Sequence, residues 1–421
     1  MRFLVTAFLL VAAWSPACAE DATFTFLRTV SVAELNEILS AERELFLRTA
    51  DPGQEYQLPA ASTAKNAVDL YTVRYTTTSP DLGNDERFTV SGLLALPKMK
   101  DPSSVPLISY QHGTVWGRYE VPSYAFKTTN PALYAHYDAA YETRFMVALF
   151  AGNGYALAAA DYLGLGDAVG SSDAYMMKRT TAQVNYSLFL DVRRYLASIS
   201  MPVSRVFLGG WSQGGLNTTG FLELLERRGV HVRAAFTAAS PNDPFVSTNR
   251  TLYHPRSNDA PWVNTILALT IFSCEKFMGL GGLAQTTILP EYLEEFRAIY
   301  ERISYPTRLM ALLAASDDKT PLDYLRPEFR DPAFFSDSAY GQCLLENETY
   351  RHEFKTDIKM FYGTKDEVVS VGVARLGAEY QEAMVSPSSS RITPIPVEGG
   401  DHRLTFISAA PIAKAWMDRL Q

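Results

Sequence analysis

The stretch VFLGGWSQGGLN, residues 206–217, places Ser212 between Gly210 and Gly214 directly after an apolar run. The residues before it, 202–210, predict a short buried strand, and those after it, 216–229, predict a helix. A sharp turn from strand to helix forces its central residue into a strained conformation and needs glycine neighbours for clearance. Such a turn would project the serine from the end of a sheet. The alternative is a glycine-rich turn with a bystander serine.

The rest of the chain alternates predicted strands and helices, which favours a mostly parallel sheet with helices on both faces. The 421 residues, 47% of them hydrophobic, are ample for a large core. Further strands are predicted at 67–79, 87–97, 105–113, 154–166, 232–241, 357–369 and 390–402. Further helices are predicted at 31–49 and 181–200.

This alternation stops between residues 242 and 356, where apolar and aromatic segments follow one another without a clean strand pattern. An insertion of this size over the end of the sheet that carries Ser212 would form a cap. The predicted organisation is therefore a leader at 1–19, a first core part at 20–241, a cap or lid at 242–356, and a second core part at 357–421.

The N-terminus, MRFLVTAFLLVAAWSPACAE, has the features of a cleavable signal peptide. A positive charge at Arg2 precedes an apolar stretch, and Ala17 to Ala19 form a small-residue cleavage site. The apolar run is too short to span a membrane, so we expect no stable membrane anchor. The sequence predicts cleavage after Ala19 and a secreted or periplasmic protein.

Charge and cysteine content narrow the possible partners. Cleavage would move the formal net charge from −8 to about −9, which argues against nucleic acid or an anionic membrane surface as a partner. Only Cys274 and Cys343 would remain, both inside the predicted cap. In an oxidising compartment they would pair as a disulfide, the alternative being two buried free thiols.

A serine hydroxyl becomes a good nucleophile only when a base removes its proton and a third group orients that base. Two later segments, each at the end of a predicted strand, supply these groups. FYGTKDEVV carries Asp366, and PVEGGDHRL carries His402. Ser212, Asp366 and His402 follow the Ser-Asp-His chain order of a hydrolase on this kind of sheet. We expect activity to fall as His402 is protonated, with an apparent pKa near its usual value of about 6.5.

Two residues compete for these roles. His112, in YQHGT, precedes the serine and lies where an oxyanion hole would be built, so shaping that loop is its expected role. Glu367 is the nearest rival of Asp366 for the acid. Asp401 adjoins the histidine and cannot easily turn toward its ring, whereas Asp317 falls within the cap.

Taken together, GWSQGG, YQHGT, ADYLGLG, YGTKDEVV and GGDH resemble the α/β-hydrolase superfamily, within it the secreted lipase and esterase group with a large cap. The resemblance implies an eight-stranded sheet with a cap between strands 6 and 7, Ser212 as nucleophile, His402 as base and Asp366 as its orienting acid. It also implies an oxyanion hole formed by the backbone N–H groups of Gln213 and Thr114.

The function expected from these features is a secreted serine carboxylesterase or lipase that acts through an acyl-enzyme. Alternatives on the same triad are a serine peptidase or an esterase for acylated polysaccharides, and a third is a non-catalytic binding protein. The expected partner is a small-molecule or lipid ester, or an acylated cell-wall polysaccharide. No cofactor and no metal are expected, because no His, Cys and Asp cluster has ligand spacing and GLGDAVG lacks the full dinucleotide fingerprint.

Overall fold

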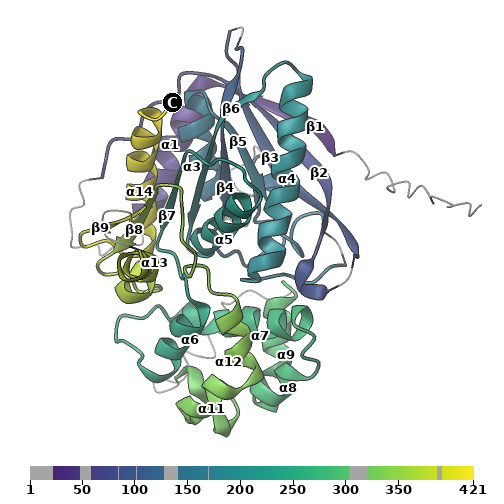
Figure 1. Cartoon of the computed structure of the whole chain (residues 1–421), viewed down its shortest axis with the longest axis vertical. Coiled ribbons are helices and arrows are strands. Elements are labelled where there is room, and N and C mark those ends of the chain that lie inside the picture. The colour runs from purple at the N-terminus through teal and green to yellow at the C-terminus, as the bar shows by residue number, and fades with distance from the viewer. Residues whose placement is uncertain are drawn as a thin grey trace, which may run out of the picture.

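The computed structural model describes residues 22–47, 58–83, 85–100, 102–127, 141–168, 170–302, 320–385 and 391–421. The predicted signal peptide at 1–19 lies outside these residues. Figure 1 shows a large twisted sheet flanked by helices, with a group of helices at one end of it.

Nine strands of the described residues form one sheet in the order β1-β2-β3-β5-β4-β6-β7-β8-β9. The strands are β1 (Thr23–Val30), β2 (Val68–Thr78), β3 (Arg87–Pro97), β4 (Val105–Gln111), β5 (Ala156–Ala160), β6 (Val203–Trp211), β7 (Ala234–Ala238), β8 (Ile358–Gly363) and β9 (Ile392–Val397). Strands β4 to β9 run parallel to one another, whereas the pairs β1–β2, β2–β3 and β3–β5 are antiparallel. The mostly parallel sheet is confirmed.

The expected count of eight strands was wrong, because β1 adds an edge strand that the sequence pattern did not reveal. Its residues, TFTFLRTV, carry apolar side chains that are only partly buried, and Phe26 is 54% exposed. A strand at the sheet edge has one open side and a weak alternation of apolar and polar residues. The assignment of β1 as a strand depends on its pairing with β2, in which Val30 lies opposite Val68.

Helices cover both faces of the sheet because successive strand residues point to opposite faces. In β6, Val206 and Leu208 join the core under α4 and α5, whereas Phe207 joins the core on the other face. The helices of the first face are α4 (Lys178–Ser198), α5 (Gln213–Arg227) and α13 (Val371–Met384). Those of the second are α1 (Val32–Leu47), α3 (Tyr141–Phe150) and α14 (His402–Asp418).

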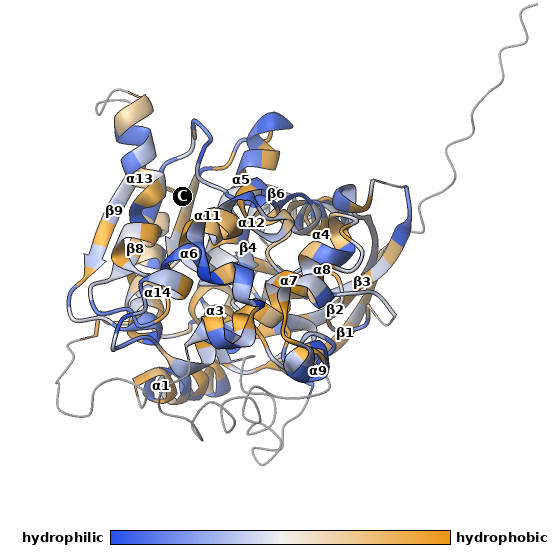
Figure 2. Cartoon of the chain, turned by 90° about the horizontal axis from the view of Figure 1, so that it is seen from below, coloured by the Kyte–Doolittle hydropathy of each residue, from blue (hydrophilic) through white to orange (hydrophobic). Residues whose placement is uncertain are grey.

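The chain between β7 and β8 forms a separate group of helices, here called the inserted helices. They are α6 (Pro244–Tyr253), α7 (Ile266–Phe277), α8 (Leu283–Thr287), α9 (Leu293–Tyr300), α11 (Pro332–Asp337) and α12 (Ala339–Glu346). They lie together below the sheet in Figure 1, and Figure 2, seen from their side, shows them in front of its strands. Leu267 and Phe272 of α7 belong to the same apolar core as residues of α4 and α5, so the core of the inserted helices is continuous with that of the sheet.

Short 3-10 helices occupy several connections. They are η1 (Pro80–Leu82), η2 (Pro122–Tyr124), η4 (Ala151–Asn153), η5 (Pro261–Thr265), η6 (Pro290–Tyr292), η7 (Pro321–Tyr324) and η8 (Pro327–Arg330). All of these except η4 begin with proline, whose fixed φ suits a first helical position.

Candidate active site

Ser212 lies in the turn between β6 and α5, as the sequence predicted, with φ of 57° and ψ of −125°. A non-glycine residue rarely adopts a positive φ, and surrounding contacts must hold it there. The Ser212 N–H donates to the Ala238 carbonyl at 2.9 Å. A Cβ on Gly210 would overlap the Gly214 carbonyl oxygen, and one on Gly214 would overlap that of Gln111. Both glycines are therefore needed for this turn to close.

His402 lies between Ser212 and Asp366 and contacts both. Its Nε2 is 2.9 Å from Ser212 Oγ, and its Nδ1 is 3.0 Å from Asp366 Oδ2. The three groups converge because Asp366 follows β8 and His402 follows β9, and parallel strands end at the same edge of the sheet. All three are shielded from solvent, with Ser212 8%, Asp366 2% and His402 3% exposed.

The Asp366 carboxylate is fixed by its own turn. Its Oδ1 accepts hydrogen bonds from the backbone N–H groups of Val368 and Val369, both at 2.8 Å. Arg256, from the inserted segment, donates to the Asp366 carbonyl oxygen at 2.9 Å. These contacts leave Oδ2 directed at the histidine ring.

Glu367, the rival acid, contacts His402 at a different atom. Its Oε2 accepts from the His402 backbone N–H at 3.0 Å rather than from the ring. Asp401 likewise turns away from the ring and accepts from the Leu404 N–H at 2.7 Å, which caps α14. Trp211 completes the support by donating from Nε1 to the His402 carbonyl at 3.1 Å.

Opposing effects act on the protonation of His402. Burial disfavours the charged ring, but the Asp366 carboxylate, through its charge and its hydrogen bond, favours it. The net result is a pKa of His402 above its usual 6.5. The value near 6.5 expected from the sequence is therefore too low for this environment.

Strand pairing brings the two predicted oxyanion donors to the same edge of the sheet. Gln111 at the end of β4 lies opposite Gly210 at the end of β6, so the loop carrying Thr114 adjoins the turn carrying Ser212. Gln213 is the first residue of α5, and its N–H therefore has no acceptor within the helix. The positive end of the α5 dipole favours a developing negative charge there.

His112 lies in this loop and does not compete with His402 for the role of base, because its ring is buried and its nitrogens contact backbone carbonyl groups. Its Nδ1 lies 2.8 Å from the Gly113 carbonyl, whose peptide carries the Thr114 N–H. The ring stacks on Tyr162 with centroids 4.1 Å apart. Burial lowers the pKa of His112 to about 4, so the ring is neutral at pH 7 and can donate from Nδ1.

Sequence reasoning missed Glu142, a buried carboxyl at the start of α3. Its Oε1 accepts from the Gly113 N–H at 2.6 Å, and its Oε2 accepts from the Tyr110 hydroxyl at 2.9 Å. Burial raises the pKa of Glu142 from 4.5 to about 8. A charged residue at the start of the apolar segment YETRFMVALF is the one signal that could have pointed to it.

The remaining predicted residues fall in different settings. Cys274 and Cys343 form a disulfide that joins α7 to α12, and the alternative of free thiols was wrong. Asp317 lies outside the described residues.

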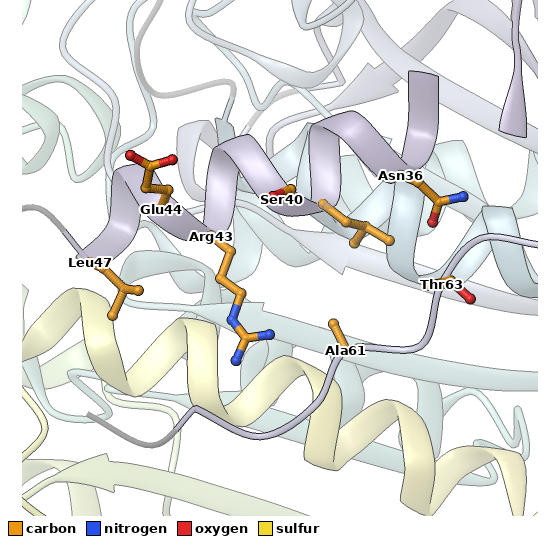
Figure 3. Close-up of a pocket in the computed structure, with 8 residues that line it drawn as sticks. Asn36, Ser40, Arg43, Glu44, Leu47, Ala61 and Thr63 are labelled. Carbon is orange, nitrogen blue, oxygen red and sulfur yellow. The ribbon is translucent and has the colours of Figure 1, made fainter. Parts of the chain in front are cut away.

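A pocket of roughly 450 Å³ lies along α1, away from this site (Figure 3). Its lining residues are Asn36, Leu39, Ser40, Arg43, Glu44, Leu47, Ala61 and Thr63. None of them belongs to the triad or to the loop at 112–115. Within the described parts of the chain, no group of three or more His, Cys, Asp and Glu side chains could hold a metal ion. No helix among those residues has both the length and the apolar character to cross a membrane.

The sheet order, the inserted helices and the serine turn together define an α/β-hydrolase fold, and solved structures agree. The rice cell wall degrading esterase LipA from Xanthomonas oryzae superposes with a TM-score of 0.76 at 17% identity, over 95% of this chain and 98% of that one. Candida antarctica lipase A gives a TM-score of 0.60 at 16% identity, over 80% of this chain and 73% of that one. No protein-family model and no curated protein sequence matches the chain.

Proposed function

We propose that this chain is a serine carboxylesterase or lipase. The observation that carries the proposal is the continuous chain of contacts from Ser212 Oγ through His402 to Asp366, at 2.9 Å and 3.0 Å. A nucleophile, a base and an orienting carboxylate at these distances match the requirements for acyl transfer to serine. The structural likeness to esterases and lipases supports the same chemistry.

In the proposed reaction, His402 Nε2 takes the proton of Ser212 Oγ as the oxygen attacks the ester carbonyl. Asp366 stabilises the imidazolium that forms and holds the ring in place. The N–H groups of Gln213 and Thr114 donate to the carbonyl oxygen as it becomes negative. His402 then returns the proton to the leaving alcohol, and a water molecule activated by the same nitrogen hydrolyses the acyl-enzyme.

Acylated polysaccharide is a second candidate substrate for the same triad. It is favoured by the likeness to the Xanthomonas oryzae structure, described as a rice cell wall degrading esterase, over nearly the whole of both chains. In this proposal the cap at residues 242–356 selects the substrate, because it lies between β7 and β8 at the end of the sheet that carries the triad.

We also propose that the protein is exported and that its leader, residues 1–19, is cleaved after Ala19. The disulfide between Cys274 and Cys343 supports an oxidising compartment, because such bonds do not persist in a reducing cytosol.

The test is hydrolysis of p-nitrophenyl esters from acetyl to palmitoyl, with acetylated xylan as a polysaccharide substrate and Ser212→Ala as the matched control. Turnover by the wild type that disappears in Ser212→Ala is the expected result. Faster turnover of long chains indicates a lipase, of short chains an esterase, and release of acetate from xylan alone favours the polysaccharide. Equal turnover in both proteins, or no turnover of any ester, contradicts the proposal.

A further inference from the structure

Arg302 connects the inserted helices to the loop that carries Thr114. It follows the last turn of α9, and its Nη1 donates to the Val115 carbonyl oxygen at 2.6 Å. Its Nη2 forms an ion pair with the Asp173 carboxylate. The Arg302 and Asp173 side chains are only 1% and 3% exposed. A guanidinium buried to this degree is tolerated only when its partners are fixed around it.

Asp173 is itself held by two of the inserted helices. Its backbone carbonyl accepts from the Ser273 hydroxyl of α7 at 2.7 Å and from the Tyr300 hydroxyl of α9 at 2.8 Å. Arg302 has a φ of 61°, a conformation that non-glycine residues adopt only when contacts impose it. Ser273, Tyr300, Arg302 and Asp173 therefore fix the place where the inserted helices meet the core.

Each residue of the loop at 113–115 is held by a different part of the chain. Glu142 binds the Gly113 N–H at 2.6 Å, the Tyr175 hydroxyl lies 2.8 Å from Thr114 Oγ1, and Arg302 binds the Val115 carbonyl. Only the last of these contacts comes from the inserted segment, just after α9. Val115 follows Thr114 in the chain, so a contact that fixes the Val115 carbonyl also restricts the main-chain rotations that orient the Thr114 N–H.

We propose that Arg302, oriented by Asp173, is a positioning residue that aims the Thr114 N–H at the oxyanion. Arg302 acts through Val115 and does not touch the substrate. The inference rests on the proposed ester hydrolysis. It assigns the inserted segment a part in the chemical step in addition to the substrate selection proposed above.

The test removes both charges at once, with Arg302→Met and Asp173→Leu in one protein, so that no unpaired charge is left buried. A matched control removes a similar buried pair, with Arg144→Met and Glu42→Leu. There, Arg144 Nε contacts Glu42 Oε1 at 2.6 Å and Nη1 donates to the Ala125 carbonyl at 3.2 Å. Circular dichroism and thermal unfolding check that each protein is folded.

We expect kcat for p-nitrophenyl butyrate to fall about tenfold to a hundredfold in the Arg302 and Asp173 double variant, with KM changed less than about twofold, because oxyanion donors act on the transition state. The control pair should keep kcat within about threefold of wild type. Arg302→Lys, which keeps the charge but loses the two-armed geometry, should give an intermediate kcat with a nearly unchanged melting temperature.

Three outcomes would overturn the inference. They are a folded double variant with wild-type kcat, an equal loss of kcat in the control pair, or an Arg302→Lys protein with wild-type kcat. The Arg302→Lys result remains decisive even if the Arg302 and Asp173 double variant does not fold. Absence of turnover by the wild type itself would instead overturn the proposed ester hydrolysis and remove the basis of this inference, so the two failures are distinguishable.

Discussion

The side chain of Glu367 accepts a hydrogen bond from the backbone N–H of His402 at 3.0 Å. Two consecutive carboxylates, Asp366 and Glu367, therefore contact different atoms of the same histidine. Asp366 contacts the ring nitrogen Nδ1, whereas Glu367 contacts the main-chain N–H. The Asp366 contact sets the orientation and charge of the imidazole, whereas the Glu367 contact fixes the position of the start of α14.

Asp366→Asn should therefore lower kcat about a thousandfold to ten-thousandfold, because an amide no longer favours the imidazolium or the correct tautomer. Glu367→Gln is the matched control, since an amide oxygen can still accept the His402 N–H, and its kcat should fall less than about tenfold. Steady-state kinetics on one ester would check both, and similar losses in the two variants would contradict this division of roles.

The rate should depend on the protonation of His402. Because Asp366 outweighs burial and raises the pKa of His402, the ring remains charged, and inactive as a base, to a higher pH than a free histidine. The acid limb of kcat/KM should have its midpoint above about 6.5. In Asp366→Asn the residual activity should show a midpoint at lower pH, and an unchanged midpoint would argue that another group causes the limb.

Gly214→Ala should abolish activity and reduce the yield of folded protein, because the new Cβ would overlap the Gln111 carbonyl in the wall of the turn. Gly220→Ala in the same helix is the control. Its Cβ would lie 3.4 Å from Lys178 Cγ, an ordinary contact, and it should stabilise the protein by about 0.5–1 kcal/mol. Thermal unfolding and ester turnover distinguish the two, and an active Gly214→Ala protein would show that the turn can widen.

Glu142 should make the fold sensitive to alkali. Its pKa in the folded protein, about 8, is above its ordinary value of 4.5, so folding favours the protonated carboxyl. This contribution to stability is complete below pH 4.5 and is lost as the pH rises through 8. Glu142→Gln should flatten the decline of melting temperature between about pH 4.5 and 8, whereas Glu294→Gln, at an exposed side chain, should leave it unchanged. Parallel curves for wild type and Glu142→Gln would contradict this account.

The disulfide between Cys274 and Cys343 closes a loop of 69 residues in the unfolded chain. Loss of a constraint of this length should cost about 2–4 kcal/mol of unfolding free energy. Replacing both cysteines with serine should lower the melting temperature and make it insensitive to reductant. Mass spectrometry without reductant should find no free thiol in the wild type, and detection of two would refute the pairing.

The sequence predicted the parts of the site that depend on local pattern and chain order. Ser212, Asp366 and His402 each follow a strand with a recognisable periodicity, and the common end of parallel strands brings them together. Glu142 and Arg302 could not be found in this way. Their partners Gly113 and Val115 are 29 and 187 positions away, and no periodicity encodes such contacts.

The dependence on local sequence pattern also explains which strands were predicted and which were missed. The starts of the parallel strands were predicted within two residues, because continuous apolar runs are distinctive, but several predicted ends run five or six residues into the following loop. The edge strand β1 was missed, since half of its side chains face solvent and its assignment depends on pairing with β2.

The strands that bracket the inserted helices, β7 and β8, are immediate neighbours, with Ala235 opposite Ile358. Because the two strands run parallel, the chain leaves the sheet at the carboxyl end of β7 and returns to the amino end of β8 beside it. The length of this connection can change at an entropic cost that grows only slowly. If the cap selects the substrate as proposed, exchange of this one segment would change substrate preference while Ser212, Asp366 and His402 are retained. On the proposed role of Arg302, a grafted segment without an equivalent of that residue would bind a new ester but cleave it about tenfold to a hundredfold more slowly.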